Sequence, residues 1–192
     1  MTPIMEPDFD WGDVQASTPI HKKGEYELTI TGVRGSAWFK RDKAGNPTTD
    51  ITKVVKLRPR IVGVYNSEGK LLTEQDGKVI KDLQCEEINL WVHTEGGRTM
   101  SKRQMMAVCG YNPFDEADEK KFNEFLKSSK LNLSSKVAEN ESGEGLVLAI
   151  GDGWKTLLVG KNVRVNMEPE VRKQEGRDDV TQQNYTRLSS VN

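Results

Sequence analysis

The stretch "GEYELTITGVRGSAWFKRDKAGNPTTDITKVVKLRPRIVGVY", residues 24–65, decides the fold. Its first part places the apolar residues Tyr26, Leu28 and Ile30 at every second position, between polar neighbours. This alternation is typical of a β-strand with one buried face. "RDKAGNPTTD" is rich in turn-forming residues, and a second strand pattern follows over residues 51–65. The stretch therefore predicts a long antiparallel hairpin.

The rest of the chain adds further strands and one helical insertion. A third strand is expected in "VIKDLQCEEINLWVH", and residues 101–130 have helical character, with Asn112 as the expected N-cap of a helix beginning at Pro113. "SSKVAENESGEG" is polar and is expected to be flexible. Strand patterns return in "GLVLAI", "KTLLVGKNVRVNMEPEV" and "NYTRLSSV".

This order of elements predicts a mainly β protein. Several short strands with glycine bends and one helical insertion fit a small closed antiparallel barrel of the oligonucleotide/oligosaccharide-binding (OB) type. An SH3-like barrel and a sandwich are the alternatives. Residues 1–23 are expected to form an extended acidic arm, and residues 24–192 a single OB-like domain with the helical insertion around 101–130.

Charge is distributed unevenly along the chain. Residues 34–60 hold eight basic and two acidic residues, a balance of 8 − 2 = +6, so with a net charge of −1 the remainder carries −1 − 6 = −7. Such a basic segment on an acidic body can bind a polyanion locally. The alternative is a two-stranded ribbon whose charged side chains are simply solvated. The sequence contains no apolar run long enough for a membrane span and no secretory signal, so we expect a cytoplasmic protein.

No pattern of catalytic or metal-binding residues stands out. The two histidines, His21 and His93, have no partner at metal-ligand spacing, and the two cysteines, Cys85 and Cys109, are expected to be small buried thiols. "GEGLVLAIGDGWK" lacks the glycine-lysine-serine/threonine ending of a phosphate-binding loop, since Trp154 separates the last glycine from the lysine. We therefore expect no enzymatic activity, no cofactor and no metal.

The stretch "SAWFKRDKAGNP", residues 36–47, joins two large aromatic residues to a basic cluster. Binding of single-stranded nucleic acid needs cations for the phosphates and flat rings on which bases stack. Trp38 and Phe39 are adjacent on a strand, so they point to opposite faces; we expect Trp38 to stack and Phe39 to pack on the core, with both in the core as the alternative. Tyr65 and Trp91 either extend the stacking surface or pack in the core. The predicted nucleic-acid-binding residues are Arg34, Trp38, Phe39, Lys40, Arg41, Lys43, Lys53, Lys56, Arg58, Arg60, Tyr65 and Trp91.

Four features together resemble the OB-fold single-stranded DNA-binding proteins of bacteriophage replication modules. They are the acidic opening "FDWGDV" followed by "GEYELTITGV", the basic tip "WFKRDKAGNP", the helical insertion, and "LLVGKNVRVNMEPEVRKQEGRDDVTQQNYTRL" near the end. The resemblance implies sequence-nonspecific binding of single-stranded DNA in phage DNA replication or recombination, in the host cytoplasm.

The chain departs from that family in one respect. Many of its members end in an acidic tail that recruits replication proteins, whereas this chain has no acidic residue after Asp179. The acidic arm, with Glu6, Asp8, Asp10 and Asp13, is an alternative surface for such partners, and a homo-oligomer is left open. Two other functions also stay open: a protein-binding factor such as a polymerase cofactor or inhibitor, and a structural β-barrel component.

Overall fold

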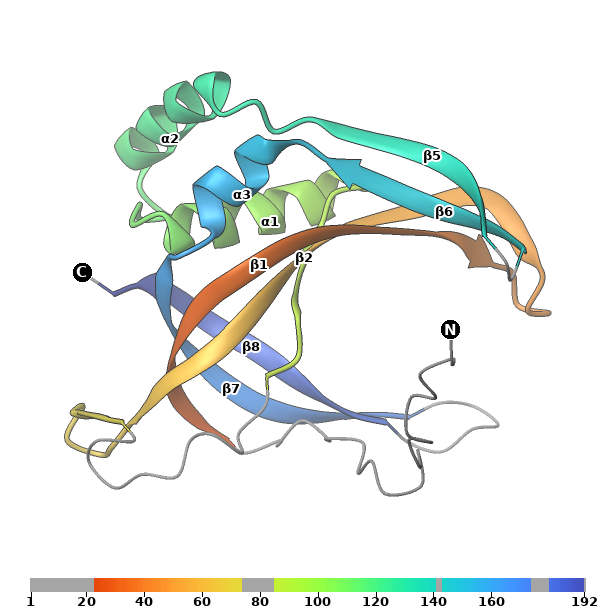
Figure 1. The fold of residues 1–192 in the computed structure, drawn as a ribbon. Coiled ribbons are helices and arrows are strands. Elements are labelled where there is room, and N and C mark those ends of the chain that lie inside the picture. Colours follow the sequence, from red (N-terminus) through yellow and green to blue (C-terminus); the bar gives the residue numbers. More distant parts are fainter. Residues whose placement is uncertain (1–22, 74–84, 141–142, 174–179, 192) are drawn as a thin grey trace, which may run out of the picture.

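A strongly bent antiparallel sheet forms the centre of the molecule. The structure, a computed structural model, describes residues 23–73, 85–140, 143–173 and 180–191. Strands β1 (Gly24–Arg41) and β2 (Pro47–Tyr65) pair as a long hairpin (Figure 1). Strands β3 (Leu71–Leu72) and β4 (Ile88–Trp91) pair with β2, and β7 (Asn162–Arg172) and β8 (Val180–Ser190) extend the sheet beyond β1.

The sheet is open, with β4 and β8 at two of its edges. Each runs antiparallel to its neighbour, so both run in the direction of β1. No ladder joins them in the described part of the chain, but the Tyr185 hydroxyl of β8 donates to the carbonyl of Glu86, just before β4, at 2.6 Å. The prediction of a mainly β, antiparallel protein is confirmed. The predicted closure into a barrel is not seen, because no ladder joins the free edge of β4 to β8 in the described ranges.

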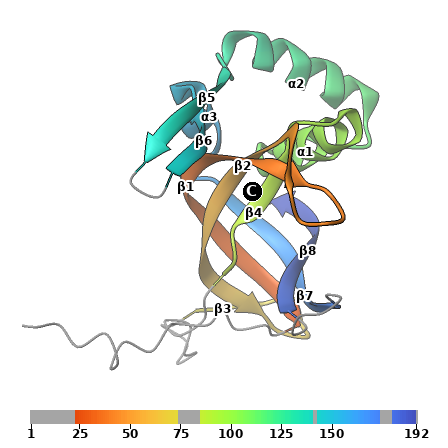
Figure 2. The same ribbon diagram turned by 90° about the vertical axis from the view of Figure 1, so that its right-hand side faces the viewer.

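A second hairpin crosses β1. Strands β5 (Leu133–Asn140) and β6 (Gly143–Ile150) pair with each other as a separate sheet, and β6 lies against β1 (Figures 1 and 2). At the crossing, a Cβ on Gly35 would lie 2.0 Å from the carbonyl oxygen of Leu148. Glycine is therefore required at this position so that the two backbones can approach.

The sequence carries no strand signal over residues 134–145, yet most of these residues belong to the β5–β6 hairpin. Strand β5 pairs with β6 through backbone hydrogen bonds, which polar residues can form as well as apolar ones. The polar composition of this stretch therefore does not indicate a strand.

The helices of the described ranges gather at one end of the sheet: α1 (Glu95–Val108), α2 (Glu116–Ser128) and α3 (Asp152–Leu158) (Figure 1). They contribute Met106, Phe122 and Leu158 to the core, which also contains Leu28 and Leu57 of the sheet. Helices therefore do occupy the region expected to be helical, although α1 begins before residue 101.

Two local predictions differ from the structure. The N-cap of α2 is Asp115, whose side chain accepts from the Asp118 amide, whereas Asn112 accepts from the amide of Phe114 within the preceding turn. Residues 155–158, expected to begin a strand, belong to α3 instead. Short apolar runs of this kind fit either a strand or a buried helix.

The two cysteines are half-buried, and burial raises the pKa of the Cys85 thiol to about 12 and that of Cys109 to about 11. Both therefore stay protonated near neutral pH, as expected for packed thiols.

The acidic residues of the predicted arm lie outside the described residues. Among the helices that the structure describes, none has the length and apolar character needed to cross a bilayer.

We predict that Gly35→Ala lowers the free energy of unfolding by about 1–3 kcal/mol, because the new methyl group meets the Leu148 carbonyl and forces β6 away from β1. Gly32→Ala is the matched control on the same strand. Its Cβ would meet nothing closer than the Cβ of Arg58 at 3.7 Å, so we expect a change within about 0.5 kcal/mol. Urea unfolding of both variants measures the difference; equal stabilities would contradict the crossing of β6 over β1.

Candidate nucleic-acid interface

The sheet has an inner face, which packs on the core, and an outer face, which points away from it. Leu57 of β2 and Leu90 of β4 are buried in the core, so alternate residues of these strands point outward. The register pairs Trp38 with Thr52, Trp91 with Val54, and Arg34 with Lys56. The outer face consists of Arg34, Ser36 and Trp38 from β1, Thr52, Val54, Lys56, Arg58 and Arg60 from β2, and Glu87, Asn89 and Trp91 from β4 and the residue before it.

Two tryptophans meet on the outer face at its end near the hairpin tip. Trp38 is 40% exposed and Trp91 is 37% exposed, and their rings lie edge to face with centroids 6.2 Å apart. Thr52 and Val54 are buried although they belong to the outer face, because their cross-strand partners are these two tryptophans. The indole rings thus cover the sheet beneath them and still present aromatic surface to solvent.

His93 extends this aromatic surface. Its ring centroid lies 5.9 Å from that of Trp91, again in an edge-to-face arrangement. Its Nδ1 lies 3.3 Å from the backbone oxygen of Lys53, which ties the histidine to the edge of β2. The three rings form one continuous aromatic cluster, made of Trp38, Trp91 and His93.

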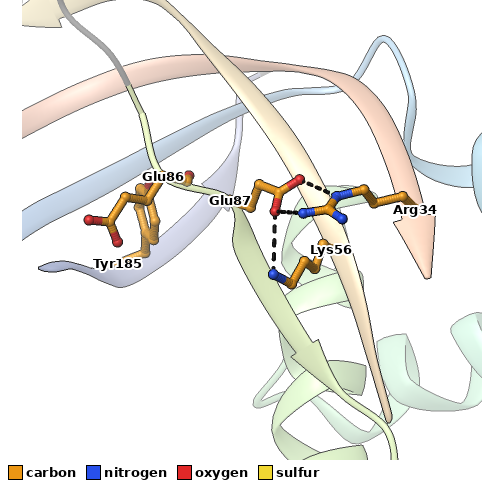
Figure 3. A network of polar contacts seen from close by, with 5 residues as sticks. All are labelled: Arg34, Lys56, Glu86, Glu87 and Tyr185. Atoms are coloured by element: carbon orange, nitrogen blue, oxygen red, sulfur yellow. Dashed lines mark hydrogen bonds and ion pairs between the residues drawn. The ribbon is translucent and has the colours of Figure 1, made fainter. Parts of the chain in front are cut away.

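A carboxylate lies among the cations of the outer face. Arg34 donates from Nε and Nη2 to the two oxygens of Glu87, each at 2.6 Å, and the Lys56 Nζ lies 3.5 Å from Glu87 Oε2 (Figure 3). The hydrogen bond from Arg34, the charge of Arg34 and the contact with Lys56 hold the pKa of Glu87 below its usual range, although partial burial acts in the opposite direction. Glu87 is therefore ionised at neutral pH and offsets part of the positive charge.

Arg58 and Arg60 continue the cationic row away from the tryptophans. Both are exposed, and neither forms an ion pair with any of the described residues. Arg58 also lines an open cavity of about 190 Å³ together with Gly32, Arg34, Lys56 and Glu87. This part of the outer face is therefore open to an anion from solution.

Some predicted residues lie at the hairpin tip or on the inner face. Phe39 and Lys53 are half-buried and alternate with outer-face residues, so they point to the inner side. Lys40 lies 4.0 Å from Asp50, the Arg41 guanidinium donates to the carbonyl of Gly45, and Lys43 is exposed in the turn. The tip residues extend the basic surface beyond Trp38, whereas Phe39 and Lys53 do not share the outer face.

Tyr65 lies at the opposite end of β2 from the tryptophans. The Arg164 guanidinium packs over the Tyr65 ring, 4.0 Å from its centroid. The Tyr65 hydroxyl donates to Glu27 at 3.1 Å. Arg164 in turn donates from two nitrogens to Glu25. The face of the Tyr65 ring is thus covered by Arg164, and Tyr65 does not lie near Trp38.

Glu87 and His93 are not among the binding residues predicted from the sequence. The alternation of Glu87, Asn89 and Trp91 within "EEINLWVH" could have placed Glu87 on the same face as Trp91. The pairing of β4 with β2 could not be read from the sequence, so the contact of Glu87 with Arg34 had no visible signal.

No cluster of three or more histidine, cysteine, aspartate or glutamate side chains suited to a metal ion occurs within the described ranges.

Comparison with known proteins gives no further guidance: no family model matches the chain, and neither a curated protein nor a solved structure matches it. The function must therefore be argued from the geometry of the outer face.

Proposed function

We propose that this protein binds single-stranded DNA without strong sequence preference, in DNA replication or recombination, and carries out no catalysis. One observation carries the proposal. Two partly exposed tryptophans share a single sheet face with a row of cations, of which Arg58 and Arg60 have no ion-pair partner among the described residues. The rings would stack with bases, and the two arginines would contact phosphates. The phage origin and the host-cytoplasm location implied by the resemblance belong to this proposal.

The topology supports an OB-type arrangement, which is part of the proposal. An OB fold is a five-stranded, partly open barrel that binds oligonucleotides on the face of its second and third strands. Here β1, β2 and β4 would correspond to its first three strands, and β7 and β8 to its last two, with the helices between them. The aromatic cluster and the cationic row would then lie on the surface that such folds use for binding.

A protein-binding factor is the second candidate. Phe114, which follows α1, is 83% exposed, and Arg103 packs over its ring at 5.6 Å from the centroid. Such an exposed aromatic residue can anchor a protein partner. The outer face favours the first candidate because it combines stacking rings and phosphate-binding cations, which a protein interface does not require together.

We expect fluorescence polarisation to show that the protein binds labelled oligothymidine more tightly than a duplex of equal length. Flexible single strands can offer both bases and phosphates to the outer face, whereas a duplex keeps its bases stacked on one another. The affinity should fall as salt rises, because binding of phosphates by cationic side chains releases counterions. Equal or tighter binding of the duplex, or degradation of the oligonucleotide by the pure protein, would contradict the proposal.

We expect the double change Arg58→Ala and Arg60→Ala to weaken binding and to leave the melting temperature nearly unchanged, because both side chains are exposed. The slope of log affinity against log salt should become shallower by about one unit for each phosphate that the variant no longer neutralises. The double change Lys120→Ala and Lys127→Ala, on α2, removes the same charge away from the outer face. If the two double variants have the same slope, Arg58 and Arg60 are only solvated surface residues.

We expect Trp38→Ala to weaken oligothymidine binding by about 1–3 kcal/mol, the usual contribution of one stacked base. Truncation of a core tryptophan typically lowers the free energy of unfolding by about 3–5 kcal/mol. We expect a smaller loss for Trp38→Ala, because Trp38 is partly exposed. Phe39→Ala is the matched control, because it removes the neighbouring ring from the inner side. Affinity is measured per folded molecule; a greater decrease for Phe39→Ala than for Trp38→Ala would show that the stacking face is wrongly assigned.

A further inference from the structure

Glu87 is the one carboxylate among the outer-face residues named above, and it lies where the cations converge. Arg34 reaches it from β1 and Lys56 from β2, while Arg58 lines the same cavity. The three cations and the carboxylate sum to a charge of 3 − 1 = +2. Glu87 therefore reduces the attraction of this surface for a polyanion without abolishing it.

The geometry around Glu87 is that of an arginine bound to an oxyanion. A guanidinium pairs with a carboxylate or a phosphate through the same two parallel N–H···O bonds. Here the Nε and Nη2 atoms of Arg34 make these bonds, and Oε2 of Glu87 is shared with Lys56. A phosphate in the same place could accept from both cations in the same way.

The cavity beside Glu87 has room for such a group. Its volume of about 190 Å³ equals that of roughly six water molecules in the liquid. The Arg34 side chain is 54% exposed, whereas Glu87 is 22% exposed and Lys56 is 24% exposed. An incoming phosphate would therefore meet Arg34 and Arg58 first, with Lys56 becoming available as Glu87 moves aside.

We infer that Glu87 occupies, in the free protein, the place of a DNA backbone phosphate between Arg34 and Lys56, and that single-stranded DNA displaces it on binding. This inference rests on the proposed function, and it adds a built-in competitor to the same site. Glu87 keeps the two cations paired while no DNA is bound. The exchange of carboxylate for phosphate then lowers the affinity compared with an unopposed cationic row.

The test compares three proteins by titration of labelled oligothymidine at low salt: the wild type, Glu87→Gln and Asp50→Asn. We expect Glu87→Gln to bind at least about tenfold more tightly than the wild type, since one strong charged competitor is removed. Asp50→Asn is the matched control, because it removes the same charge beside Lys40 at the hairpin tip, where the ion pair is long at 4.0 Å. Its affinity should change less than about threefold.

A double-mutant cycle shows whether Glu87 acts through Arg34. In the Arg34→Ala background, the increase in affinity from Glu87→Gln should shrink to less than about threefold, because the strongest pairing partner is already gone. A weaker Glu87→Gln complex would mean that Glu87 positions Arg34 for the DNA, and an increase no larger than that of Asp50→Asn would mean a general charge effect. Either result would overturn the inference.

A second measurement uses the wild-type protein and so does not depend on how the variants fold. Carbon NMR of the Glu87 carboxyl during a pH titration should give a higher pKa with oligothymidine bound than without, because displacement removes Arg34 from the carboxylate. The charged groups facing it are Arg34 from β1 and Lys56 and Arg58 from β2. An unchanged pKa would show that Glu87 stays on Arg34 and would overturn the inference.

The two proposals fail in different ways. If neither the wild type nor Glu87→Gln binds oligothymidine, the proposed function is wrong, and the inference falls with it. If the wild type binds and Glu87→Gln is no tighter, only the inference is wrong. If Glu87→Gln binds and the wild type does not, the competitor role is supported in its strongest form.

Discussion

The register between β1 and β2 is the constraint on which the rest of the structure depends. The two strands pair from Tyr26 opposite Val64 to Arg41 opposite Pro47, which is nearly their whole length. Since side chains alternate between faces, a slip of one residue would turn Trp38 inward and Phe39 outward. The same slip would separate Arg34 from Lys56. The composition of the outer face is therefore a consequence of this one pairing.

The packing of the inner face leaves the outer face open. Leu148 of β6 and core residues of α1 and α3 pack on the inner side, where Gly35 lets β6 come into contact with β1. The described elements bring no helix or hairpin across the row formed by Lys56 and Arg58, so charged side chains can remain there in contact with water. Segregation of this kind concentrates aromatic and cationic groups on one surface, as single-strand binding requires.

Parts of this arrangement could be predicted from local sequence. Alternation along 24–65 predicted the hairpin, and the adjacency of Trp38 and Phe39 predicted their opposite directions, which agrees with their positions in the structure. These features depend only on the two-residue period of a strand. The β5 strand was missed because its pairing with β6 uses backbone groups that composition does not reveal.

The parts that could not be predicted depend on contacts between distant segments. Glu87 meets Arg34 only because β4 pairs with β2, and no local pattern indicates which strands will be neighbours. The same limit applies to the closure of the sheet, which no local pattern in the sequence predicts. The sequence predicts short antiparallel strands, but whether their sheet closes depends on the edges of β4 and β8, where the hydroxyl of Tyr185 donates to the carbonyl of Glu86.

Photochemical crosslinking tests the central claim most directly, because it locates the DNA on the protein. Oligothymidine carrying iodouracil would be irradiated in complex with the wild-type protein, and the crosslinked residues would be identified by mass spectrometry. We expect crosslinks at Trp38 and Trp91, on β1 and β4. Crosslinks confined to α2 or to the β5–β6 hairpin, with none on the outer face, would contradict the account.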